Sequence, residues 1–515
     1  MNLKKIKRAI ISVSDKSNLK KILQNLKKFK IKLISSGGTY KEITRLGFNC
    51  EKISNYTNTP EILNGRVKTL HPKVHAGILS KRKDKSHIKD LRKNSFNEID
   101  LVIVNFYPFE KNLENSKNHE KIIENIDIGG PTLVRAAAKN YNDVTVITSP
   151  EQYDNLINEL NKFNGKTSLR FRQEMSENAF GETAFYDSVI ANYFTKVTCN
   201  KFPKKKLIFG NLIDKLRYGE NPHQEAAIYS IKKKLSLNQI GGKKLSYNNY
   251  NDIFSALLIS KSLPKGKGTV IVKHANPCGI SINNNKIKSY RLALSCDPIS
   301  AFGGVVSFNF KINESLAKEI NKMFLEVVIA NGFEKKALKV LKNKKNLRII
   351  NANNLNKENF INIKSNFDTF LIQTPDTKIF NKKNFKVVSK VKPSRKILKN
   401  LIFAFNISKY VKSNAVVLVK DETTVGIGSG QPSRLDSCKI AIDKMKKFQK
   451  IDNSNEIVAA SDAFFPFVDG LESLIQSGVC AVVQPSGSIN DKEIIKFADQ
   501  TGTILVFSKT RHFNH

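Results

Sequence analysis

Short apolar segments alternate with amphipathic helical segments along most of the chain, and no other feature of the sequence constrains the fold as strongly. In the first 150 residues the apolar segments have the character of buried strands and span 9–13, 31–34, 101–104 and 144–147. Between the first two, apolar residues recur at helical spacing from Leu19 to Leu26, and Ser14 and Asp15 offer oxygens that could cap this helix. A second series of strand segments follows at 270–272, 305–308, 416–419, 457–460 and 479–483. The alternation predicts an α/β fold with a largely parallel sheet.

With 515 residues, the chain is too long for one ordinary domain. Its composition, 40% hydrophobic and 25% charged, is sufficient for well-packed cores and excludes a disordered or fibrous protein. A long helical segment covers about 167–194, and the basic segment 201–206 then has the composition of a linker. We therefore expect two domains, 1–199 and 200–515. No repeat of fixed period is visible.

The sequence carries no signal for a membrane or secretory protein. No apolar run approaches the roughly 18 residues of a membrane-spanning helix, and no signal-peptide core follows the basic first nine residues. The six cysteines are far apart and never form Cys-x-x-Cys; they are Cys50, Cys199, Cys278, Cys296, Cys438 and Cys480. This usage argues against a disulfide framework and a structural zinc site, and it favours the reducing cytoplasm.

The chain is strongly basic: 86 Lys and Arg residues against 45 Asp and Glu residues give a net charge of +41. One interpretation is a nucleic-acid-binding protein. The other is a chain whose codons drift towards Lys, Asn and Ile. The second is favoured, because the lysines are spread along the sequence and are not interleaved with stacking aromatic residues. A diffuse positive field would still attract anionic small molecules.

Two short turns follow neighbouring strand segments and suit a bound anion. Ser36-Gly-Gly-Thr39 lies between a strand and a helix, where glycines let backbone N–H groups approach a phosphate. Ser14-Asp-Lys16 follows the first strand at its carboxyl end, where open α/β sheets bind ligands. A Gly-Gly pair alone is more often only a turn. The two turns together predict a phosphate pocket.

The segment 65–75 is dense in polar residues. His71 and His75 have the spacing of paired metal ligands on a helix, but we expect Pro72 to disrupt that helix, and the glutamate of His-Glu-x-x-His is missing. A metal site is therefore disfavoured. Arg66 and Lys68 are better interpreted as a clamp for an anion.

The segment 127–140 combines a carboxylate, a glycine turn and a basic helix. Asp127 precedes the turn, and Arg135 and Lys139 follow at i,i+4 spacing. The simpler alternative is that Asp127 caps the helix and that the two cations form its solvated face. Asn105 ends the strand segment 101–104, where a polar side chain would face a ligand crevice.

These motifs form an ordered series that is far more specific than any one of them. In the first half they are Ser-Asp-Lys (14–16), Ser-Gly-Gly-Thr (36–39), Gly-Arg-Val-Lys-Thr-Leu-His-Pro (65–72), Asn-Phe-Tyr-Pro-Phe (105–109) and Asp-Ile-Gly-Gly-Pro-Thr (127–132). In the second half they are Arg-Tyr-Gly-Glu-Asn-Pro-His-Gln (217–224), Lys-His-Ala-Asn-Pro-Cys-Gly (273–279), Ser-Ala-Phe-Gly-Gly (300–304), Lys-Ser-Asn-Ala (412–415), Gly-Ser-Gly-Gln-Pro-Ser-Arg (428–434), Ser-Asp-Ala-Phe-Phe-Pro-Phe (461–467) and Arg-His-Phe-Asn-His (511–515). From about residue 12 to residue 515, the series closely resembles the family in which phosphoribosylaminoimidazolecarboxamide (AICAR) formyltransferase is fused to inosine monophosphate (IMP) cyclohydrolase.

The resemblance implies a methylglyoxal-synthase-like cyclohydrolase domain, 1–199, followed by a transformylase region, 200–515, built from two cytidine-deaminase-like subdomains. It implies formyl transfer from 10-formyltetrahydrofolate to AICAR, giving the formylated nucleotide FAICAR, and then dehydrative cyclisation of FAICAR to IMP. It also implies a homodimer with transformylase sites shared between subunits. It implies no metal, nucleic-acid or membrane partner.

In the cyclohydrolase domain, the resemblance assigns nucleotide contacts and reacting groups. The nucleotide contacts are Ser14, Asp15, Lys16, Ser36, Gly37, Gly38, Thr39, Arg66, Val67, Thr69, Val104, Asn105 and Ile128. The reacting groups are Lys68, Tyr107, Asp127 and Lys139. This set is chemically sensible, because a carboxylate and a tyrosine can move protons while lysines stabilise the oxyanion that leaves as water.

In the transformylase region, the resemblance makes His274 the proton acceptor for the attacking amine, with Lys273 stabilising the oxyanion or the leaving nitrogen. The AICAR contacts are Arg217, Tyr218, Gly303, Glu326, Asn414, Arg434, Phe464 and Arg511, and the folate contacts are Asp469, Ser488 and Ile489. Three residues depart from the family pattern, because Glu326 replaces an aspartate of some members and Val468 and Asn514 replace basic residues.

A zinc nucleobase deaminase is a further alternative, since the expected subdomain fold and Pro277-Cys278 are compatible with it. His223-Gln-Glu225 supplies the His-x-Glu half of that signature. The other half is missing, because no Cys-x-x-Cys occurs in the sequence.

Overall fold

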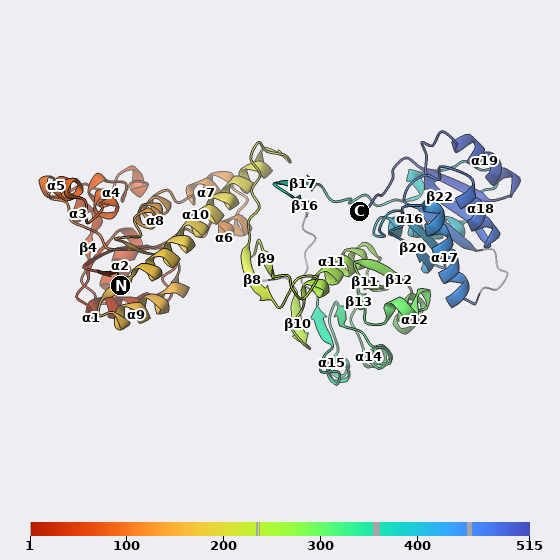
Figure 1. The fold of residues 1–515 in the computed structure, drawn as a ribbon, viewed down its shortest axis with the longest axis horizontal. Coiled ribbons are helices and arrows are strands. Elements are labelled where there is room, and N and C mark those ends of the chain that lie inside the picture. Colours follow the sequence, from red (N-terminus) through yellow and green to blue (C-terminus); the bar gives the residue numbers. More distant parts are fainter. Residues whose placement is uncertain (1, 233–234, 236, 354–360, 451–455) are drawn as a thin grey trace. The chain divides into compact units, whose positions relative to one another are not determined.

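The structure is a computed structural model that describes residues 2–232, 235, 237–353, 361–450 and 456–515 (Figure 1). The chain divides into two compact units, Met1–Gly210 and Asn211–His515. Between α10 (Leu169–Val197) and β8 (Asn211–Leu216), residues 198–210 form no helix or strand. The expected boundary between residues 199 and 200 lies in this segment. Among the described residues, no helix is both long and apolar enough to cross a membrane.

The first unit is built on a five-stranded parallel sheet in the order β4-β3-β2-β5-β6. Its strands are β2 (Arg8–Val13), β3 (Lys32–Ser35), β4 (Glu51–Lys52), β5 (Leu101–Asn105) and β6 (Thr145–Ile147), and a separate antiparallel pair is formed by β1 (Leu3–Lys5) and β7 (Lys166–Ser168). The helices are α1 (Leu19–Lys28), α2 (Gly37–Arg45), α3 (Ile53–Thr57), η1 (Leu63–Gly65), α4 (Pro72–Leu79), α5 (Lys85–Lys93), α6 (Phe109–Asn115), α7 (His119–Glu124), α8 (Gly129–Lys139), η2 (Pro150–Gln152), α9 (Tyr153–Lys162) and α10. The predicted strands and the parallel sheet are confirmed.

The order of the strands creates a switch point between β2 and β5. From β2 the chain adds β3 and β4 on one side, and it then returns to add β5 and β6 on the other. The pairing of Val13 with Asn105 brings the carboxyl ends of β2 and β5 level. In open α/β sheets, ligands bind outside the carboxyl ends of the strands at such a point.

Two local predictions for this unit are wrong. Helix α1 begins after Asn18, which has a left-handed φ of 58° and makes no side-chain cap bond, while Asp15 instead accepts a hydrogen bond from the N–H of Ser17 at 2.8 Å. Pro72 does not disrupt a helix. It is the first residue of α4, where its missing N–H would be unpaired anyway, and the His71 ring caps that turn.

The second unit contains a twelve-stranded sheet in the order β10-β15-β14-β13-β11-β12-β20-β19-β21-β22-β23-β18. Its strands are β10 (Asn238–Gly241), β11 (Gly268–Lys273), β12 (Asn276–Ile282), β13 (Val305–Phe308), β14 (Val327–Ala330), β15 (Arg348–Asn351), β18 (Phe385–Val387), β19 (Val416–Lys420), β20 (Thr423–Gly428), β21 (Ile457–Ser461), β22 (Val479–Pro485) and β23 (Ile504–Ser508). Two smaller hairpins pair β8 with β9 (Ala226–Ser230) and β16 (Asn362–Asn366) with β17 (Thr369–Gln373). The helices are α11 (Tyr247–Ser262), α12 (Lys286–Cys296), α13 (Pro298–Ala301), α14 (Glu314–Ile320), α15 (Lys335–Lys342), η3 (Lys382–Asn384), α16 (Arg395–Ser408), α17 (Arg434–Phe448), α18 (Asp469–Gln476) and α19 (Asp491–Gln500).

This sheet contains the same arrangement twice, in green and in blue in Figure 1. In each half, an antiparallel hairpin (β11–β12 or β19–β20) is followed by three mutually parallel strands (β13–β15 or β21–β23), and a final antiparallel strand (β10 or β18) closes the outer edge. Both hairpins carry a register shift at the same place, after Ile271 and after Leu418. The repeat that the sequence does not display is therefore present in the structure, in agreement with the two expected subdomains.

Hydrophobic residues divide between the two faces of this sheet. On one face, α11 and α16 pack into a single cluster that runs across both halves, from Ile253 to Val506. On the other face each half has its own cluster, around Phe308 under α12, α14 and α15 and around Phe465 under α17, α18 and α19. The two halves thus share one core and keep two separate ones.

Candidate functional site

Asn105 connects the carboxyl ends of β2 and β5 at the switch point of the first unit. Its Oδ1 accepts hydrogen bonds from the N–H groups of Ser14 at 2.7 Å and Asp15 at 2.9 Å, and its Nδ2 donates to the Asp15 carbonyl at 2.9 Å. These three bonds fix the turn that carries Lys16. A Cβ placed on Gly38 would lie 4.0 Å from the Lys16 ammonium nitrogen. The two predicted anion-binding turns are therefore neighbours.

The amino end of α2 is free to receive an anion. Ser36 precedes the helix without a side-chain cap bond, and Gly37 has a φ of 51°. The hydroxyl of Thr39 bonds both the N–H and the carbonyl of Val13 at 3.0 Å, which locks the turn to β2. Because a helix N-terminus carries a partial positive charge and unpaired N–H groups, this turn suits a phosphate.

Lys68 lies against the same turn from the loop after η1. A Cβ on Gly37 would lie 3.1 Å from the Lys68 Nζ, and one on Gly65, whose φ is 84°, would lie 2.6 Å from its Cε. Both glycines therefore make room for this side chain. Lys68 also pairs with Glu61 at 3.4 Å, and Arg66 pairs with Glu124 at 3.2 Å. Each cation of the predicted clamp has an acidic neighbour in addition to any ligand.

Asp127 stands at the amino end of α8 and makes the predicted cap bond. Its Oδ1 accepts a hydrogen bond from the Gly130 N–H at 2.8 Å, and its own N–H donates to the Tyr186 hydroxyl at 2.9 Å. Burial raises the pKa of the Asp127 carboxyl, against hydrogen bonds from the Gly130 and Tyr107 N–H groups that lower it. A carboxyl with a raised pKa suits proton transfer near neutral pH. The cap and the proposed chemical role are thus compatible.

The remaining predicted residues of this unit occupy different positions around the turn. Val104 is buried in β5, whereas the side chains of Tyr107 and Ile128 are about half exposed. Thr69 approaches the start of α8, since a Cβ on Gly129 would lie 2.9 Å from the Thr69 hydroxyl. Lys139 is exposed at the other end of α8. Ten residues of helix separate it from Gly129, a distance of about 15 Å, so this chain alone does not bring Lys139 to the cluster.

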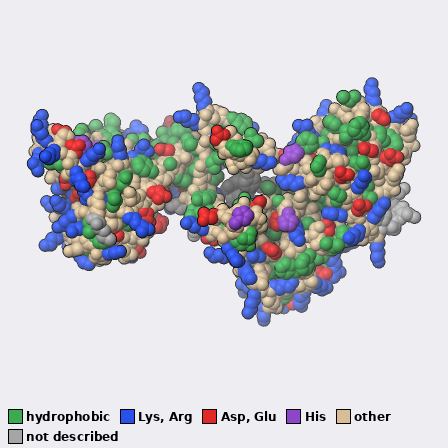
Figure 2. Space-filling model, in the orientation of Figure 1, with side chains coloured by type: hydrophobic (Ala, Val, Ile, Leu, Met, Phe, Trp, Pro, Cys, Tyr) green, Lys and Arg blue, Asp and Glu red, His purple; other side chains and the backbone are tan. Residues whose placement is uncertain are grey.

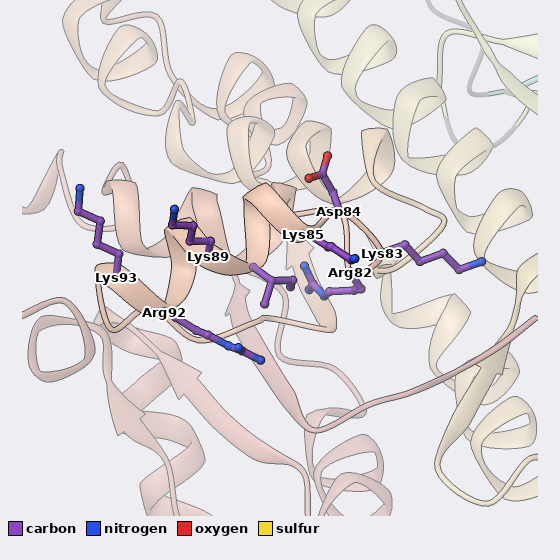
Figure 3. Close-up of a pocket in the computed structure, with 8 residues that line it drawn as sticks. Arg82, Lys83, Asp84, Lys85, Lys89, Arg92 and Lys93 are labelled. Atoms are coloured by element: carbon purple, nitrogen blue, oxygen red, sulfur yellow. The ribbon is translucent and has the colours of Figure 1, made fainter.

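A separate basic cavity of about 700 Å³ lies beside α5. Figure 3 shows its cationic side chains, which come from α5 and the loop before it; they are Arg82, Lys83, Lys85, Lys89, Arg92 and Lys93. Arg82 donates to the Ile99 carbonyl at 2.9 Å, beside the amino end of β5. The family motifs, by contrast, gather at the carboxyl ends of the strands. The cavity is therefore a local concentration of Lys and Arg side chains, which are scattered over the face shown in Figure 2.

In the second unit, Lys273 and His274 stand at the turn between β11 and β12. Lys273 is the last residue of β11, and its ammonium donates to the Phe302 carbonyl at 2.8 Å. His274 is exposed and, like Ala275, has a positive φ, 53° and 57° respectively. Asp252 on α11 accepts a hydrogen bond from the Ala275 N–H at 2.6 Å. The turn is therefore held from below by a carboxylate that no sequence motif singled out.

Glu326 lies close to this turn. Its carboxylate accepts a hydrogen bond from the Asn249 amide at 2.7 Å and pairs with Arg348 at 3.4 Å. Its backbone N–H donates to the Gly304 carbonyl at 3.0 Å, next to Gly303, whose φ is 73°. A glutamate at this position is thus accommodated and has partners within the chain.

Arg434 organises a second cluster. Its guanidinium donates to the Asn414 Oδ1 at 2.7 Å and the Ser461 hydroxyl at 2.6 Å, and it forms an ion pair with the buried Asp462. The arginine side chain is only 9% exposed, so its orientation is set by these partners. A charge-assisted network of this kind is rigid and leaves little freedom to the groups that it holds.

Hydrogen bonds connect the two clusters of the second unit. The Asn276 Oδ1 accepts a hydrogen bond from the Lys412 N–H at 3.0 Å, which joins the β11–β12 turn to the segment that carries Asn414. The Ser413 N–H donates to the Asn514 carbonyl at 2.9 Å, and the Asn514 N–H donates to the Ser413 hydroxyl at 3.0 Å, so the C-terminal tail lies beside the same segment. Because these are backbone bonds of Asn514, the departure from the family pattern there does not remove the contact.

The other predicted contacts of the second unit are placed apart from one another. Arg217 stacks on Tyr218 at 5.5 Å in the turn after β8, and the Arg511 guanidinium lies 4.6 Å from the Phe513 ring. Phe464 and the fully exposed Ile489 project into solvent. Ser488 precedes Ile489 in a loop, and Asp469 begins α18. The structure does not bring these side chains into contact with Lys273 or His274.

Among the described residues, no group of three or more His, Cys, Asp and Glu side chains could hold a metal ion. His223 and Glu225, which suggested a zinc deaminase, are both exposed. His71 is a helix cap, and burial lowers the pKa of His75. All six cysteines are free thiols.

Two functional candidates were missed by the sequence analysis, Glu61 and Asp252. Glu61 pairs with Lys68, and Asp252 holds the His274 turn. Neither lies in a glycine-rich or strand-end motif; Glu61 precedes the motif that contains Lys68, and Asp252 approaches the His274 turn from α11. The signal for Asp252 is the helical spacing of Ile253, Ala256 and Leu257 directly after it.

Comparison with known proteins identifies the family of this chain. A family model described as an AICARFT/IMPCHase bienzyme matches residues 137–444, and one described as an MGS-like domain matches residues 18–132. The chain is 41% identical to the bifunctional purine biosynthesis protein PurH of Bradyrhizobium diazoefficiens over 99% of both chains. It is 42% identical to PurH of Leptospira biflexa, over 99% of both chains, and 44% identical to PurH of Lactobacillus acidophilus, over 99% of this chain and 100% of the relative.

The two α/β units, together with the description shared by these relatives, define the class of this protein as a bifunctional enzyme. The high identity over nearly the whole length makes the assignment specific. The chain belongs to the AICARFT/IMPCHase bienzyme family.

Proposed function

We propose that this chain carries out the last two steps of purine nucleotide synthesis, from AICAR to IMP. In the first step the amine of AICAR attacks the formyl carbon of 10-formyltetrahydrofolate, and the bond from that carbon to the folate nitrogen breaks. The products are FAICAR and tetrahydrofolate. In the second step the carboxamide nitrogen attacks the same formyl carbon, and its oxygen leaves as water to give IMP.

One observation supports this proposal most: the family motifs of the first unit lie together at the carboxyl ends of β2 and β5, where their groups suit a nucleotide. In the first unit, the uncapped end of α2, with Lys16 and Lys68 nearby, suits the phosphate of the nucleotide. Asp127, whose pKa is raised by burial, would move a proton of the carboxamide. Lys68 would stabilise the developing oxyanion.

In the second unit, we assign His274 as the group that accepts the proton of the attacking amine. The ring stands on an exposed turn, where a substrate can reach it. Lys273, beside it in sequence, would stabilise the tetrahedral oxyanion or assist the leaving nitrogen. Arg434, Asn414, Glu326, Gly303, Arg217, Tyr218, Phe464 and Arg511 are the proposed AICAR contacts. Asp469, Ser488 and Ile489 are the proposed folate contacts.

Lys139 remains a proposed reacting group of the cyclohydrolase, but its position needs an explanation. It is exposed at the far end of α8. A direct role would require that a second protomer complete the pocket. We therefore treat Lys68 and Asp127 as the groups that this chain itself supplies.

We also propose a homodimer with shared transformylase sites, acting in the cytoplasm. The proposed AICAR and folate contacts that do not meet within this chain support sharing, because a second subunit could supply them. Mixing a Lys273→Ala variant with an Arg217→Ala variant tests this, because Arg217 does not meet Lys273 within one chain. Partial recovery of activity after verified subunit exchange supports a shared site, and no recovery contradicts it.

The decisive test of the proposed function follows each half-reaction separately in purified protein. Formyl transfer is measured with AICAR and 10-formyltetrahydrofolate, and cyclisation is measured with FAICAR alone. We expect both activities. A protein that catalyses neither step, although folded, would overturn the proposal.

A further inference from the structure

The internal repeat of the second unit allows the His274 turn to be compared with its counterpart in the same molecule. In the first half, Lys273 ends β11, and His274 and Ala275 form the turn. In the second half, Lys420 ends β19, and Asp421 and Glu422 form the turn, with φ values of 51° and 52°. The two turns have the same conformation and follow the same register shift.

Each turn is held by one side chain from the helix beneath it. In the first half, the Asp252 Oδ1 accepts the Ala275 N–H at 2.6 Å. In the second half, the Asn400 Oδ1 accepts the Glu422 N–H at 2.9 Å. Both side chains occur six residues after the serine that caps their helix, Ser246 or Ser394. The second half therefore demonstrates that a neutral amide is sufficient to hold this turn.

The turn of the first half therefore does not need a carboxylate to hold its conformation. Burial raises the pKa of Asp252, while hydrogen bonds from the Ala275 and His274 N–H groups and the nearby charge of His274 lower it. A buried charge is costly unless it is paired. Where the turn carries no histidine, the molecule uses asparagine instead.

We propose that Asp252 is a positioning residue for formyl transfer: its carboxylate tethers the β11–β12 turn and supplies a negative charge that makes His274 a better proton acceptor. The inference rests on the proposed role of His274. It adds that the charge of Asp252, and not only its hydrogen bond, contributes to the reaction.

The other charged groups around the turn set the background for this effect. They are Lys273 on β11, Glu326 before β14, Arg348 on β15 and Lys412 before β19. Glu326 is already paired with Arg348. Lys273 and Lys412 are positive and oppose protonation of the ring. Asp252 is thus the carboxylate that accepts a hydrogen bond from the backbone of the turn.

The test is Asp252→Asn, which keeps the hydrogen-bond acceptor and removes the charge. Because a negative neighbour favours the imidazolium, its removal lets the ring lose its proton at lower pH. The acid limb of the formyl-transfer profile should move down by roughly half to one pH unit, and the plateau rate should fall by about 3- to 10-fold, since a weaker base accepts a proton less readily. Cyclisation of FAICAR should be unchanged.

The matched control is Asp421→Asn, at the second turn. Asp421 is exposed and pairs with Lys396 at 3.0 Å. This variant loses one carboxylate from the same unit but leaves the His274 turn intact, so it should keep the parental pH profile. A second variant, Asp252→Ala, removes the tether as well. It should lower the rate of formyl transfer further than Asp252→Asn does.

The possible results are distinguishable. A parental enzyme without formyl-transfer activity contradicts the proposed function itself. An active parent whose Asp252→Asn variant keeps the same acid limb and plateau overturns the role of the charge. If Asp252→Asn and Asp252→Ala both lower the rate without moving the acid limb, Asp252 has a purely structural role, and the proposal is also overturned.

Discussion

At the scale of single residues, Asp127 combines a structural bond with a proposed chemical task. Its carboxylate caps α8 through the Gly130 N–H. Asparagine is as good a helix cap as aspartate. The two tasks can therefore be separated by one substitution.

Replacing Asp127 by asparagine should slow cyclisation of FAICAR by ~10²–10⁴-fold, the usual scale for losing a proton-transfer group. Because burial raises the pKa of Asp127 in the folded state, the native carboxyl contributes stability at low pH that is lost as the pH rises through the raised pKa. The variant should therefore be at least as stable as the parent at pH 7. Rates on FAICAR and urea unfolding at pH 5 and 7 measure both effects. Formyl transfer is the internal control, and a variant that cyclises at the parental rate contradicts the assignment.

Lys139→Ala should accumulate FAICAR while formyl transfer proceeds, if a second protomer brings this lysine into the pocket. The intermediate must be quantified directly, because formyl transfer is reversible and a blocked second step lowers apparent flux through the first. Arg135→Ala is a suitable control, since Arg135 is also exposed and lies one turn earlier on α8. Parental cyclisation in the Lys139 variant would remove Lys139 from the reacting groups and leave Lys68 and Asp127.

At the scale of elements, two hairpin strands of the repeat pass very close to the helices that cross them. A Cβ on Gly279 in β12 would lie 1.8 Å from the Ala293 carbonyl of α12. In the second half, one on Gly426 in β20 would lie 2.2 Å from the Ala441 carbonyl of α17. The obstacle in each case is backbone, which cannot rotate away.

Gly279→Ala should therefore destabilise the second unit by about 1–3 kcal/mol or more, as overpacking does. The control is Gly181→Ala within α10, where a Cβ meets nothing within 4 Å. That change should stabilise the first unit by about 0.5–1 kcal/mol, because alanine is the better helix former. Urea unfolding monitored separately for each unit measures both. Equal stability of the Gly279 variant and the parent would contradict the close packing.

The elements that could be predicted from the sequence are those whose own composition indicates a buried strand. The strands β2, β5 and β13 are mostly apolar, and their buried environment follows from that composition. The internal repeat was not predictable, because its halves share register and turn conformation while their turn residues differ, His274-Ala275 against Asp421-Glu422. Ordered motifs gave most of the candidate site. Asp252 was not predicted, because only the folded chain brings it to the Ala275 N–H. Glu61 was not predicted, because it lies outside the motif that contains its partner Lys68.

At the scale of the whole molecule, the two units should be separable, and the structure refines where to divide them. The first unit extends to Gly210. Phe209 packs edge-on against Phe185 at 5.5 Å, as part of a cluster around Phe109 and Tyr186. A division after residue 199 removes this ring from the cluster.

A fragment of residues 1–210 should cyclise FAICAR and unfold at a higher temperature than a fragment of residues 1–199. Truncating a partly buried aromatic contact costs about 1 kcal/mol or more. A 1–210 fragment with Phe209→Ala should behave like the shorter one. Thermal unfolding and FAICAR turnover of the three fragments provide the comparison. A 1–210 fragment that folds but is inert would contradict the proposed division of activities.

The junction of β12 and β20, where the two halves of the second unit meet, determines whether these halves could exist separately. The strands β12 and β20 meet there through a single backbone register pair, supported by a 2.8 Å bond between the Ser281 and Thr423 hydroxyls and a 2.9 Å bond from the Ile280 N–H to Thr424. Cutting at this junction would expose two open sheet edges and divide the apolar cluster beneath α11 and α16. Open edges recruit other strands, so an isolated half would self-associate and would not persist as a soluble monomer. Evolutionary shuffling of either half into another protein would carry the same penalty of aggregation.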